Sequence, residues 1–312
     1  MTKLKGILLT QGMHGMISQV EGLAKALDLD FTHHTVELNN FWKLIPPKIT
    51  PISQKVFKKI EVKDFDVIIS CGRKSVIPSI YLKKNSSKKI INIHIQDPKV
   101  NLNNFSYVIA PEHDGLTGKN VYSTKGAMHY LTKEEIDNHT NYLKDKLQSG
   151  KEYFLLILGG PTKHYDYSEG NIINIFNLYN DLITKNNLQG IIIPSMRTPK
   201  NTIDLAKNKL GEKNLVIDTV DKKAYLSALS LAKFIAVTCD STSMISEAAL
   251  TGKPIYVADI PTKKNDQRIQ KFKELFHQLN ITKKLDTKLE TWDYEILDET
   301  SRVAKEIKKQ LI

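Results

Sequence analysis

The sequence predicts an α/β protein made of two doubly wound domains, and three observations support this prediction. At 312 residues the chain is too long for most single hydrophobic cores and suits two domains of about 150 residues each. Short runs of β-branched residues alternate with helical segments along the chain, which is the pattern of parallel βαβ units. A hydrophobic content of 41% and a charged content of 25% are ordinary for a folded protein, so disorder is not indicated.

The first domain is expected to contain five parallel strands with helices between them. The predicted strands are residues 6–10, 32–38, 67–71, 90–94 and 107–110. The predicted helices include residues 17–27 and 75–83.

The second half of the sequence repeats this scheme. Its predicted strands are residues 154–158, 190–194, 215–218, 234–239 and 254–258. Its predicted helices are residues 170–185, 203–209, 222–231 and 242–250.

Residues 132–150 connect the two halves, and their opening TKEE has the pattern of a capping box before a polar helix. We place the domain junction near Gly150, which gives an N-terminal domain of residues 1–150 and a C-terminal domain of residues 151–291. Residues 292–312 are predicted to form an amphipathic helix that crosses back onto the first domain. Its apolar face is expected to carry Ile296, Val303, Ile307 and Leu311.

The charge balance restricts the expected partners. The chain has 45 basic and 34 acidic residues, a net charge of +11 that is compatible with a polyanionic partner, although a solvated, lysine-rich surface is the favoured interpretation. No stripe of arginines interleaved with aromatic residues occurs, so nucleic acid is not the expected partner. Only four of the basic residues are arginines, and these are candidates for the bidentate binding of phosphate or carboxylate. They are Arg73, Arg197, Arg268 and Arg302.

The cysteines and the apolar runs indicate a compartment. Cys71 and Cys239 are far apart in sequence, so neither a disulfide framework nor a cysteine metal site is predicted. The first ten residues contain too short an apolar stretch for a secretory signal, and no run of about 18 apolar residues occurs. We therefore expect a cytoplasmic protein without a transmembrane segment, at most peripheral at the inner membrane.

The most informative segment is DSTSMISEAALTGKP, residues 240–254, which follows a predicted strand. A helix that starts here presents unpaired backbone N–H groups and the positive end of its dipole to an anion. Asp240, Ser241, Thr242 and Ser243 are therefore candidates for binding a diphosphate. Glu247 lies one helical turn beyond Ser243, where its carboxylate can reach the hydroxyls of an attached ribose. The alternative is that Asp240 or Ser241 merely caps the helix and that Glu247 is solvated or ion-paired.

The first predicted strand also ends in a glycine-bearing turn before a helix. Gly12 permits a positive φ and the close approach of a ligand to the backbone. His14 can act as a general base or donate to a phosphate, because a histidine titrates near neutral pH. The turn lacks the spacing of the known nucleotide-binding motifs, and a solvated loop histidine is the alternative.

Further polar residues follow other predicted strands of the first domain, at the edge where ligands of parallel sheets bind. Arg73 and Gln96 are candidate contacts to an anion or an acceptor, as is Glu112. Its neighbours His113 and Asp114 are candidate catalytic acids or bases. Three adjacent side chains rarely converge on one ion, so no metal site is expected here.

In the second domain, Gly159 and Gly160 follow one predicted strand, and Ser195 and Arg197 follow the next. Arg197 is placed to clamp a diphosphate, with an ordinary salt bridge as the alternative. Arg268 follows the last predicted strand and is a further candidate for anion contact.

Several of these segments, in order, resemble one family. They are GRK at Gly72, QDPK at Gln96, PEHDG at Pro111, GGP at Gly159, SMRTP at Ser195 and VTCDSTSMISEAALTGKPIYV from Val237. The chain resembles the Elongated Mitochondria family of mitochondrial fission factors, as a bacterial member. Family members commonly carry Gln where this chain has Lys74 and Arg where it has Lys99. The second difference argues against bidentate anion recognition at that position.

The resemblance implies a fold of the glycosyltransferase-B type, with two Rossmann-like domains facing a cleft. In such enzymes the second domain holds a nucleotide diphosphate-sugar by a helix N-terminus and a downstream Glu, which residues 240–247 match. The implied function is a metal-independent glycosyltransferase without a cofactor, acting on a nucleotide-sugar and an acceptor that the sequence does not identify. Arg197 would offset the charge of the leaving group, and His14, His113 or Asp114 would deprotonate the acceptor.

Two other functions remain open. A recruitment or scaffold protein would keep the fold without turnover and use an exposed apolar segment, for which the tail helix is the candidate. A nucleotide-sugar epimerase would act on the donor alone. The sequence gives no oligomeric state.

Overall fold

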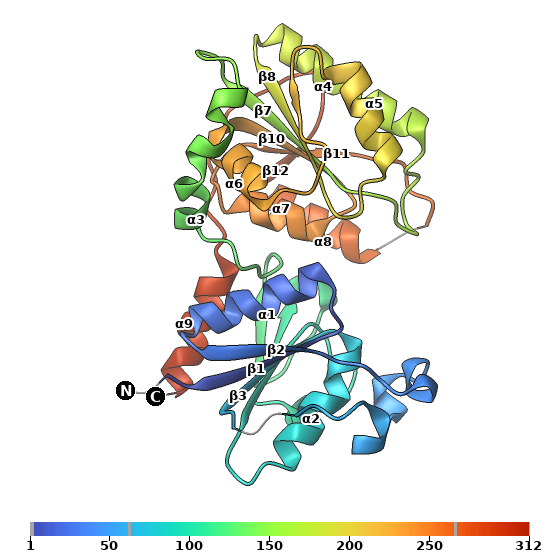
Figure 1. Ribbon diagram of the computed structural model, residues 1–312, viewed down its shortest axis with the longest axis vertical. Helices are drawn as coiled ribbons and strands as arrows, with labels where there is room; N and C mark the ends of the chain where they lie inside the picture. The colour runs from blue at the N-terminus through green and yellow to red at the C-terminus, as the bar shows by residue number, and fades with distance from the viewer. Residues whose placement is uncertain (1–2, 62–63, 265–266, 312) are drawn as a thin grey trace. The chain divides into compact units, whose positions relative to one another are not determined.

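The computed structural model describes residues 3–61, 64–264 and 267–311. The chain forms two compact units. The first combines the chain up to Tyr130 with the chain from Asp298 onward, and the second is the continuous segment Leu131–Leu297. Each unit contains a six-stranded sheet whose neighbouring strands are all parallel, with helices on its faces (Figure 1). The predicted α/β class with two doubly wound domains is therefore confirmed.

The sheet of the first unit has the strand order β2-β1-β3-β4-β5-β6. Its strands are β1 Lys5–Thr10, β2 Asp30–Thr35, β3 Val67–Cys71, β4 Ile91–Ile95, β5 Tyr107–Pro111 and β6 Val121–Thr124. The central strands β3 and β4 are buried on both faces, and Ile or Val occupies three of the five positions in each.

Helices cover both faces of this sheet (Figure 1). They are α1 His14–Ala26, α2 Val76–Lys84 and α9 Glu299–Leu311. On one face, Leu23 of α1 and Ile307 of α9 share a core cluster with Ile69 of β3. On the other face, Ile77 of α2 packs with Ile68 of β3. Because neighbouring residues of a strand point to opposite faces of the sheet, Ile68 contributes to one core and Ile69 to the other.

The sheet of the second unit has the strand order β12-β11-β10-β7-β8-β9. Its strands are β7 Tyr153–Leu158, β8 Gln189–Pro194, β9 Leu215–Val216, β10 Ala232–Thr238, β11 Ile255–Ala258 and β12 Thr282–Lys284. Its helices are α3 Lys133–Asn138, α4 Glu169–Lys185, α5 Lys200–Leu210, α6 Lys222–Leu231, α7 Thr242–Ala249 and α8 Gln267–Gln278.

The boundary between the units falls after Tyr130, not near the expected Gly150. The intervening segment belongs to the second unit because α3 and the turn that follows it pack on α6. The Ser227 hydroxyl of α6 accepts from Leu143 N at 3.1 Å and donates to Thr140 O at 3.0 Å. These contacts hold residues 131–150 in the second unit, whereas the sequence analysis assigned them to the N-terminal domain.

The tail also differs from its prediction. Residues 292–297 lie in the second unit, where the Trp292 ring contacts Tyr256 with centroids 5.1 Å apart. The helix starts only at Glu299. Within it, Val303 and Ile307 are fully buried against the first unit, whereas Ile296 lies before the helix and is 50% exposed.

The tail helix therefore joins the first unit, as expected, with its apolar face already covered. Among the described residues, no helix combines the length and the apolarity needed to span a bilayer.

Candidate functional site

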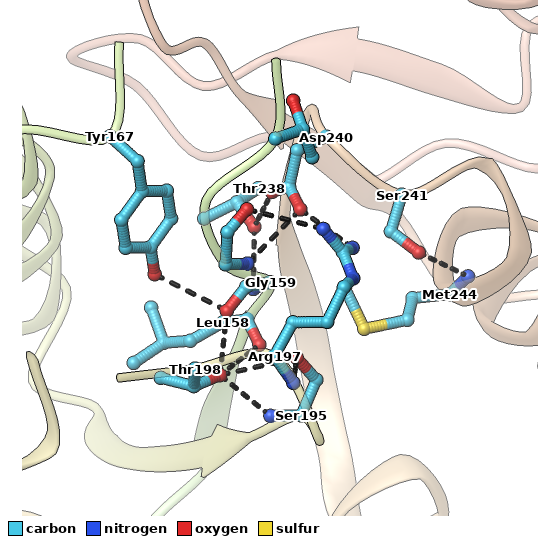
Figure 2. Close-up of polar contacts among 12 residues, drawn as sticks. Leu158, Gly159, Tyr167, Ser195, Arg197, Thr198, Thr238, Asp240, Ser241 and Met244 are labelled. Carbon is cyan, nitrogen blue, oxygen red and sulfur yellow. Dashed lines mark hydrogen bonds and ion pairs between the residues drawn. The ribbon is translucent and has the colours of Figure 1, made fainter. Parts of the chain in front are cut away.

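The candidate site of the second unit lies where its strand order reverses. The chain leaves β7 toward β8 and β9 on one side and later fills β10, β11 and β12 on the other. Ligands of open parallel sheets bind at the carboxyl ends of the strands at such a reversal. The loops after β7, β8 and β10 meet there, joined by hydrogen bonds and an ion pair (Figure 2).

Asp240, two residues beyond the end of β10, is the centre of these contacts. Its Oδ1 accepts from the Thr238 hydroxyl at 2.7 Å, and its Oδ2 accepts from Gly160 N at 3.1 Å. The same Oδ2 lies 2.7 Å from Arg197 Nη2. The side chain of Asp240 has no exposed surface. Asp240 therefore fixes the loops and does not itself face a ligand.

Arg197 is the charged group that this network leaves accessible. Its guanidinium points toward Asp240 (Figure 2), and its Nη1 donates to Gly160 O at 3.1 Å. Its side chain remains 41% exposed. A guanidinium has five N–H donors, so donors remain for an incoming anion while the carboxylate holds the group in one orientation.

The two glycines after β7 are required by the packing of this network. A Cβ on Gly159 would overlap the Asp240 carboxylate, and a Cβ on Gly160 would overlap the backbone carbonyl of Arg197. The sequence predicted nucleotide contacts for both glycines. The structure gives them a different requirement, which is close approach between protein groups.

Ser195 and Thr198 close the loop that carries Arg197. The Thr198 hydroxyl accepts from Ser195 N at 2.8 Å and donates to Gly159 O at 2.6 Å. The Ser195 hydroxyl accepts from Arg197 N at 3.3 Å. Ser195 therefore supports the backbone of the arginine.

A cavity of about 280 Å³ lies beside the loops after β7 and β8. Its lining is formed by Pro161, Tyr167, Glu169, Pro199, Asn201, Thr202 and Leu205. Tyr167 joins it to the network, because its hydroxyl donates to Gly159 O at 3.3 Å. Burial raises the pKa of Tyr167, so this side chain is a neutral phenol.

α7 begins immediately after Asp240. Ser241 is its N-cap, and the Ser241 hydroxyl accepts from Met244 N at 3.3 Å (Figure 2). The capping alternative is thus realised by Ser241. Thr242 and Ser243 follow with half-buried side chains, and in the described part of the chain their backbone N–H groups have no hydrogen-bond partner. These N–H groups and the helix dipole favour an anion beside Arg197.

Glu247 lies one turn further along α7 and is half-buried. The Tyr225 hydroxyl of α6 donates to its Oε2 at 2.8 Å. Burial raises the pKa of the Glu247 carboxyl to about 7, against a smaller lowering effect of this hydrogen bond. The group therefore changes charge near neutral pH.

In the first unit, the strand order reverses between β1 and β3. Gly12, after β1, has a φ of 85°, and His14 is the exposed first residue of α1. Gly72, after β3, has a φ of 88°, and a Cβ there would overlap the Met16 side chain. The predicted loops after β1 and β3 thus lie side by side.

Arg73 and Gln96 lie at neighbouring strand ends. The Arg73 guanidinium donates to the carbonyl oxygens of Lys43 and Ile45, so it holds the segment between β2 and β3. Gln96 has a φ of 83° and donates its N–H to Ile109 O at 2.7 Å. A positive φ at a non-glycine residue is strained backbone, which clusters at functional sites.

Glu112, His113 and Asp114 form one short 3₁₀ turn after β5. His113 Nε2 lies 3.8 Å from Asp114 Oδ1, and their side chains are only 5% and 12% exposed, whereas Glu112 is exposed. Across the described residues, no group of three His, Cys, Asp or Glu side chains is placed to hold a metal ion. The catalytic roles expected for His14, His113 and Asp114 stay predictions, as does the anion or acceptor contact expected for Glu112.

Arg268 is an exposed residue in the first turn of α8. Residues 265 and 266, which the sequence analysis grouped with it, lie outside the described residues.

Sequence reasoning missed three residues of this region. Thr238 lies two residues before Asp240 and accepts from Gly159 N at 2.8 Å, a role that the Thr-x-Asp spacing at a strand end signals in retrospect. Tyr167 and Tyr225 are remote in sequence from their partners. No local pattern signals either of them.

Comparison with known proteins was made on the whole chain. The mitochondrial fission ELM1 family matches residues 14–311. The uncharacterized protein RP120 of Rickettsia prowazekii (strain Madrid E) is 27% identical over 338 residues, covering 94% of this chain and 95% of that protein. Mitochondrial fission protein ELM1 of Arabidopsis thaliana is 24% identical over 275 residues, covering 78% of this chain but only 64% of that protein.

Solved structures similar to this chain include transferases and epimerases. The glycotransferase of kitacinnamycin gives a TM-score of 0.59 at 12% identity, covering 100% of both chains. UDP-GlcNAc 2-epimerase from Neisseria meningitidis, bound to UDP-GlcNAc, gives 0.53 at 14% identity, covering 98% of this chain and 100% of that one. The S. aureus MnaA-UDP co-structure gives 0.53 at 15% identity, covering 98% and 88%. At such identities the likeness concerns the fold, and it confirms the glycosyltransferase-B type.

Proposed function

We propose that this chain, which belongs to the mitochondrial fission ELM1 family, is a glycosyltransferase that binds a nucleotide diphosphate-sugar in its second unit. The observation that carries the proposal is the half-exposed Arg197 guanidinium, held by the buried Asp240 at the reversal of strand order. Asp240 is followed directly by the N-terminus of α7. A fixed cation beside free helix N–H groups suits a diphosphate.

The same groups supply the chemistry of sugar transfer. Negative charge develops on the diphosphate as the bond to the sugar breaks. Arg197 and the N–H groups of Thr242 and Ser243 would stabilise that charge without a metal. Because Asp240 keeps Arg197 oriented before the ligand arrives, little reorganisation is needed during the reaction.

Other residues would bind the rest of the donor and the acceptor. Glu247 would accept hydrogen bonds from the ribose hydroxyls, and the cavity lined by Tyr167 offers both ring and polar contacts to a base or a sugar. His14 or Asp114 of the first unit would take the proton of the acceptor hydroxyl. The predicted cleft and the predicted base both stay predictions.

Titration calorimetry with a panel of nucleoside diphosphates tests the proposal. We expect at least one to bind, and Arg197→Ala to weaken it by about tenfold to a hundredfold, because hydrogen bonds to charged groups contribute about 1.5–3 kcal/mol. Lys213→Ala is the control, since Lys213 is exposed in the turn before β9, at the opposite end of the strands. Absence of binding, or equal affinity in both variants, would refute the proposal.

Epimerisation is the second candidate, favoured by the likeness to structures of UDP-GlcNAc 2-epimerases. It uses the same diphosphate site without an acceptor. Incubation with nucleotide-sugars alone, followed by product analysis, separates the two. A new sugar isomer on the intact nucleotide indicates epimerisation, whereas unchanged donor is expected for a transferase.

The tail helix does not provide the exposed apolar surface that the scaffold alternative requires. The tail helix was its candidate docking segment, yet Val303 and Ile307 are fully buried within the first unit. Any exposed apolar surface must therefore come from another segment.

A further inference from the structure

An exposed apolar surface does occur in the first unit, on the segment between β2 and β3. It carries three short 3₁₀ turns, Asn40–Lys43, Pro47–Ile49 and Gln54–Val56. Among the described residues, ten large apolar side chains are exposed, and four of them fall within twelve consecutive positions of this segment. They are Phe41 at 68%, Leu44 at 83%, Ile49 at 69% and Ile52 at 38% exposure. Together we call them the apolar cluster.

The charged residues within the stretch that carries the apolar cluster have one sign. From Leu38 to Ile60 the sequence contains five lysines and no Asp or Glu. Lys43, Lys48 and Lys55 are exposed and, within the described residues, form no ion pair. The acidic residues nearest in sequence are Glu37, which pairs with Lys58, and Glu61, which pairs with Lys59.

The backbone of the segment is anchored, so the exposure of its apolar side chains is built into the fold. Asn39 N donates to Val56 O at 2.9 Å, and Asn39 Nδ2 donates to Lys55 O at 2.7 Å. Val56 lies in the core, while Arg73 binds the carbonyls of Lys43 and Ile45. In Figure 1 the segment forms the blue turns that project from the strands of the first unit.

Exposed Phe, Leu and Ile beside lysines that form no ion pair among the described residues suit the boundary between lipid headgroups and acyl chains. The apolar groups insert at that boundary, while the lysines are attracted to anionic headgroups. Four exposed large apolar side chains within twelve positions of a folded protein indicate an interaction surface. An apolar protein partner would not require the uniform positive charge.

We propose that the apolar cluster and Lys43, Lys48 and Lys55 dock the first unit onto an anionic lipid surface. This docking is independent of what the second unit binds, so the failure of one proposal leaves the other standing.

Vesicle flotation with the full chain tests the docking. Vesicles of equal parts phosphatidylglycerol and phosphatidylcholine should carry the protein, and vesicles of phosphatidylcholine alone should not. Lys43→Gln with Lys48→Gln should weaken binding by about fivefold for each lysine removed. Phe41→Ser with Leu44→Ser should abolish flotation. Since the four substituted side chains, two lysines and two apolar residues, are exposed, the melting temperatures of both double variants should stay unchanged.

Matched controls lie in the second unit. Val220→Ser changes another apolar side chain that is 54% exposed, and Lys185→Gln with Lys213→Gln removes the same charge from exposed positions. Both should float like the unchanged protein. The proposal is overturned by equal binding to the two kinds of vesicle, by absence of binding, or by equal losses in the control variants.

Trp42 provides an independent readout of depth. The chain has only two tryptophans, and the other, Trp292, packs on Tyr256 in the second unit. In a Trp292→Phe variant, fluorescence reports Trp42 alone, whose ring lies 4.9 Å from that of Phe41. Anionic vesicles should shift its emission to the blue, and brominated lipids should quench it. An unchanged spectrum in the presence of bound vesicles would place the contact elsewhere and overturn the assignment.

Discussion

At the scale of single residues, three of the four arginines make contacts that depend on the shape of the guanidinium group. Arg73 binds two backbone carbonyls, Arg197 binds a carboxylate and a carbonyl, and Arg302 binds Glu299 and Ser123 O. Each uses the flat guanidinium for more than one partner, which lysine cannot reproduce. All of these partners belong to the protein itself. Arg73 and Arg197 both lie at a reversal of strand order, but only Arg197 is held by a carboxylate that is followed directly by a helix N-terminus.

Glu247 predicts a pH dependence of stability. Burial raises its pKa from 4.5 to about 7, so the folded protein keeps a proton that the unfolded chain has already released. The stability contributed by the group is present below pH 4.5 and is lost as the pH rises through about 7. Glu247→Gln should therefore raise the melting temperature at about pH 8.5 and change it little at about pH 5.

Thermal unfolding at the two pH values measures this effect, with Glu274→Gln, an exposed carboxylate on α8, as the control. A Glu247→Gln shift of the same size at both pH values would contradict the raised pKa.

At the scale of elements, ten strands could be predicted and two short edge strands could not. Each of the ten predicted strands overlaps an observed one. For the buried strands the signal is their content of Ile, Val and Leu. The partly exposed edge strand β2 has the sequence DFTHHT and lacks that signal. β6, with the sequence VYST, and β12, with TKK, are edge strands whose side chains carry no such signal. α8 was missed because its overall polarity hides the pair Phe272 and Phe276, which alone bury its inner face.

The tail helix gives a test at this scale, because the sequence placed Ile296 and Ile307 on one stripe and the structure separates them. Ile307→Ala should lower the free energy of unfolding by about 2–5 kcal/mol, since it leaves a cavity in the core shared with α1. Ile296→Ala, at a half-exposed position, should change it by less than about 0.5 kcal/mol. Urea denaturation of both variants measures the difference. Similar losses of unfolding free energy in the two variants would instead support the single apolar stripe expected from the sequence.

The site shows the same division between pattern and packing. The loops, the residue types and the helix N-terminus followed from strand ends and helix signals. The pairing of Arg197 with Asp240 and of Tyr225 with Glu247 did not, because each joins residues that only the packed sheet and helices bring together. Packing also changed the meaning of Asp240, which the sequence offered as a ligand contact and the structure buries.

At the scale of the whole molecule, the second unit is a continuous segment with its own sheet and core. A fragment of residues 131–297 should therefore unfold in one cooperative transition and bind nucleoside diphosphates like the full chain. A fragment of residues 151–291, cut at the boundaries expected from the sequence, lacks α3 and exposes the surface of α6 that Leu143 covers. It should unfold at lower urea concentration and less cooperatively.

Circular dichroism in urea and calorimetry of both fragments check this prediction. Equal stability of the two would show that residues 131–150 do not belong to the second unit.

The discontinuity of the first unit has a consequence for the order of events on the ribosome. Its last helix, α9, is synthesised only after the whole of the second unit, yet Val303 and Ile307 complete its core. The segment made first therefore leaves the exit tunnel with the α1 face of its sheet only partly covered, and this face stays incomplete while residues 131–297 are translated. The second unit can close its own core during that interval. The unit whose synthesis begins first is thus the last to complete its fold.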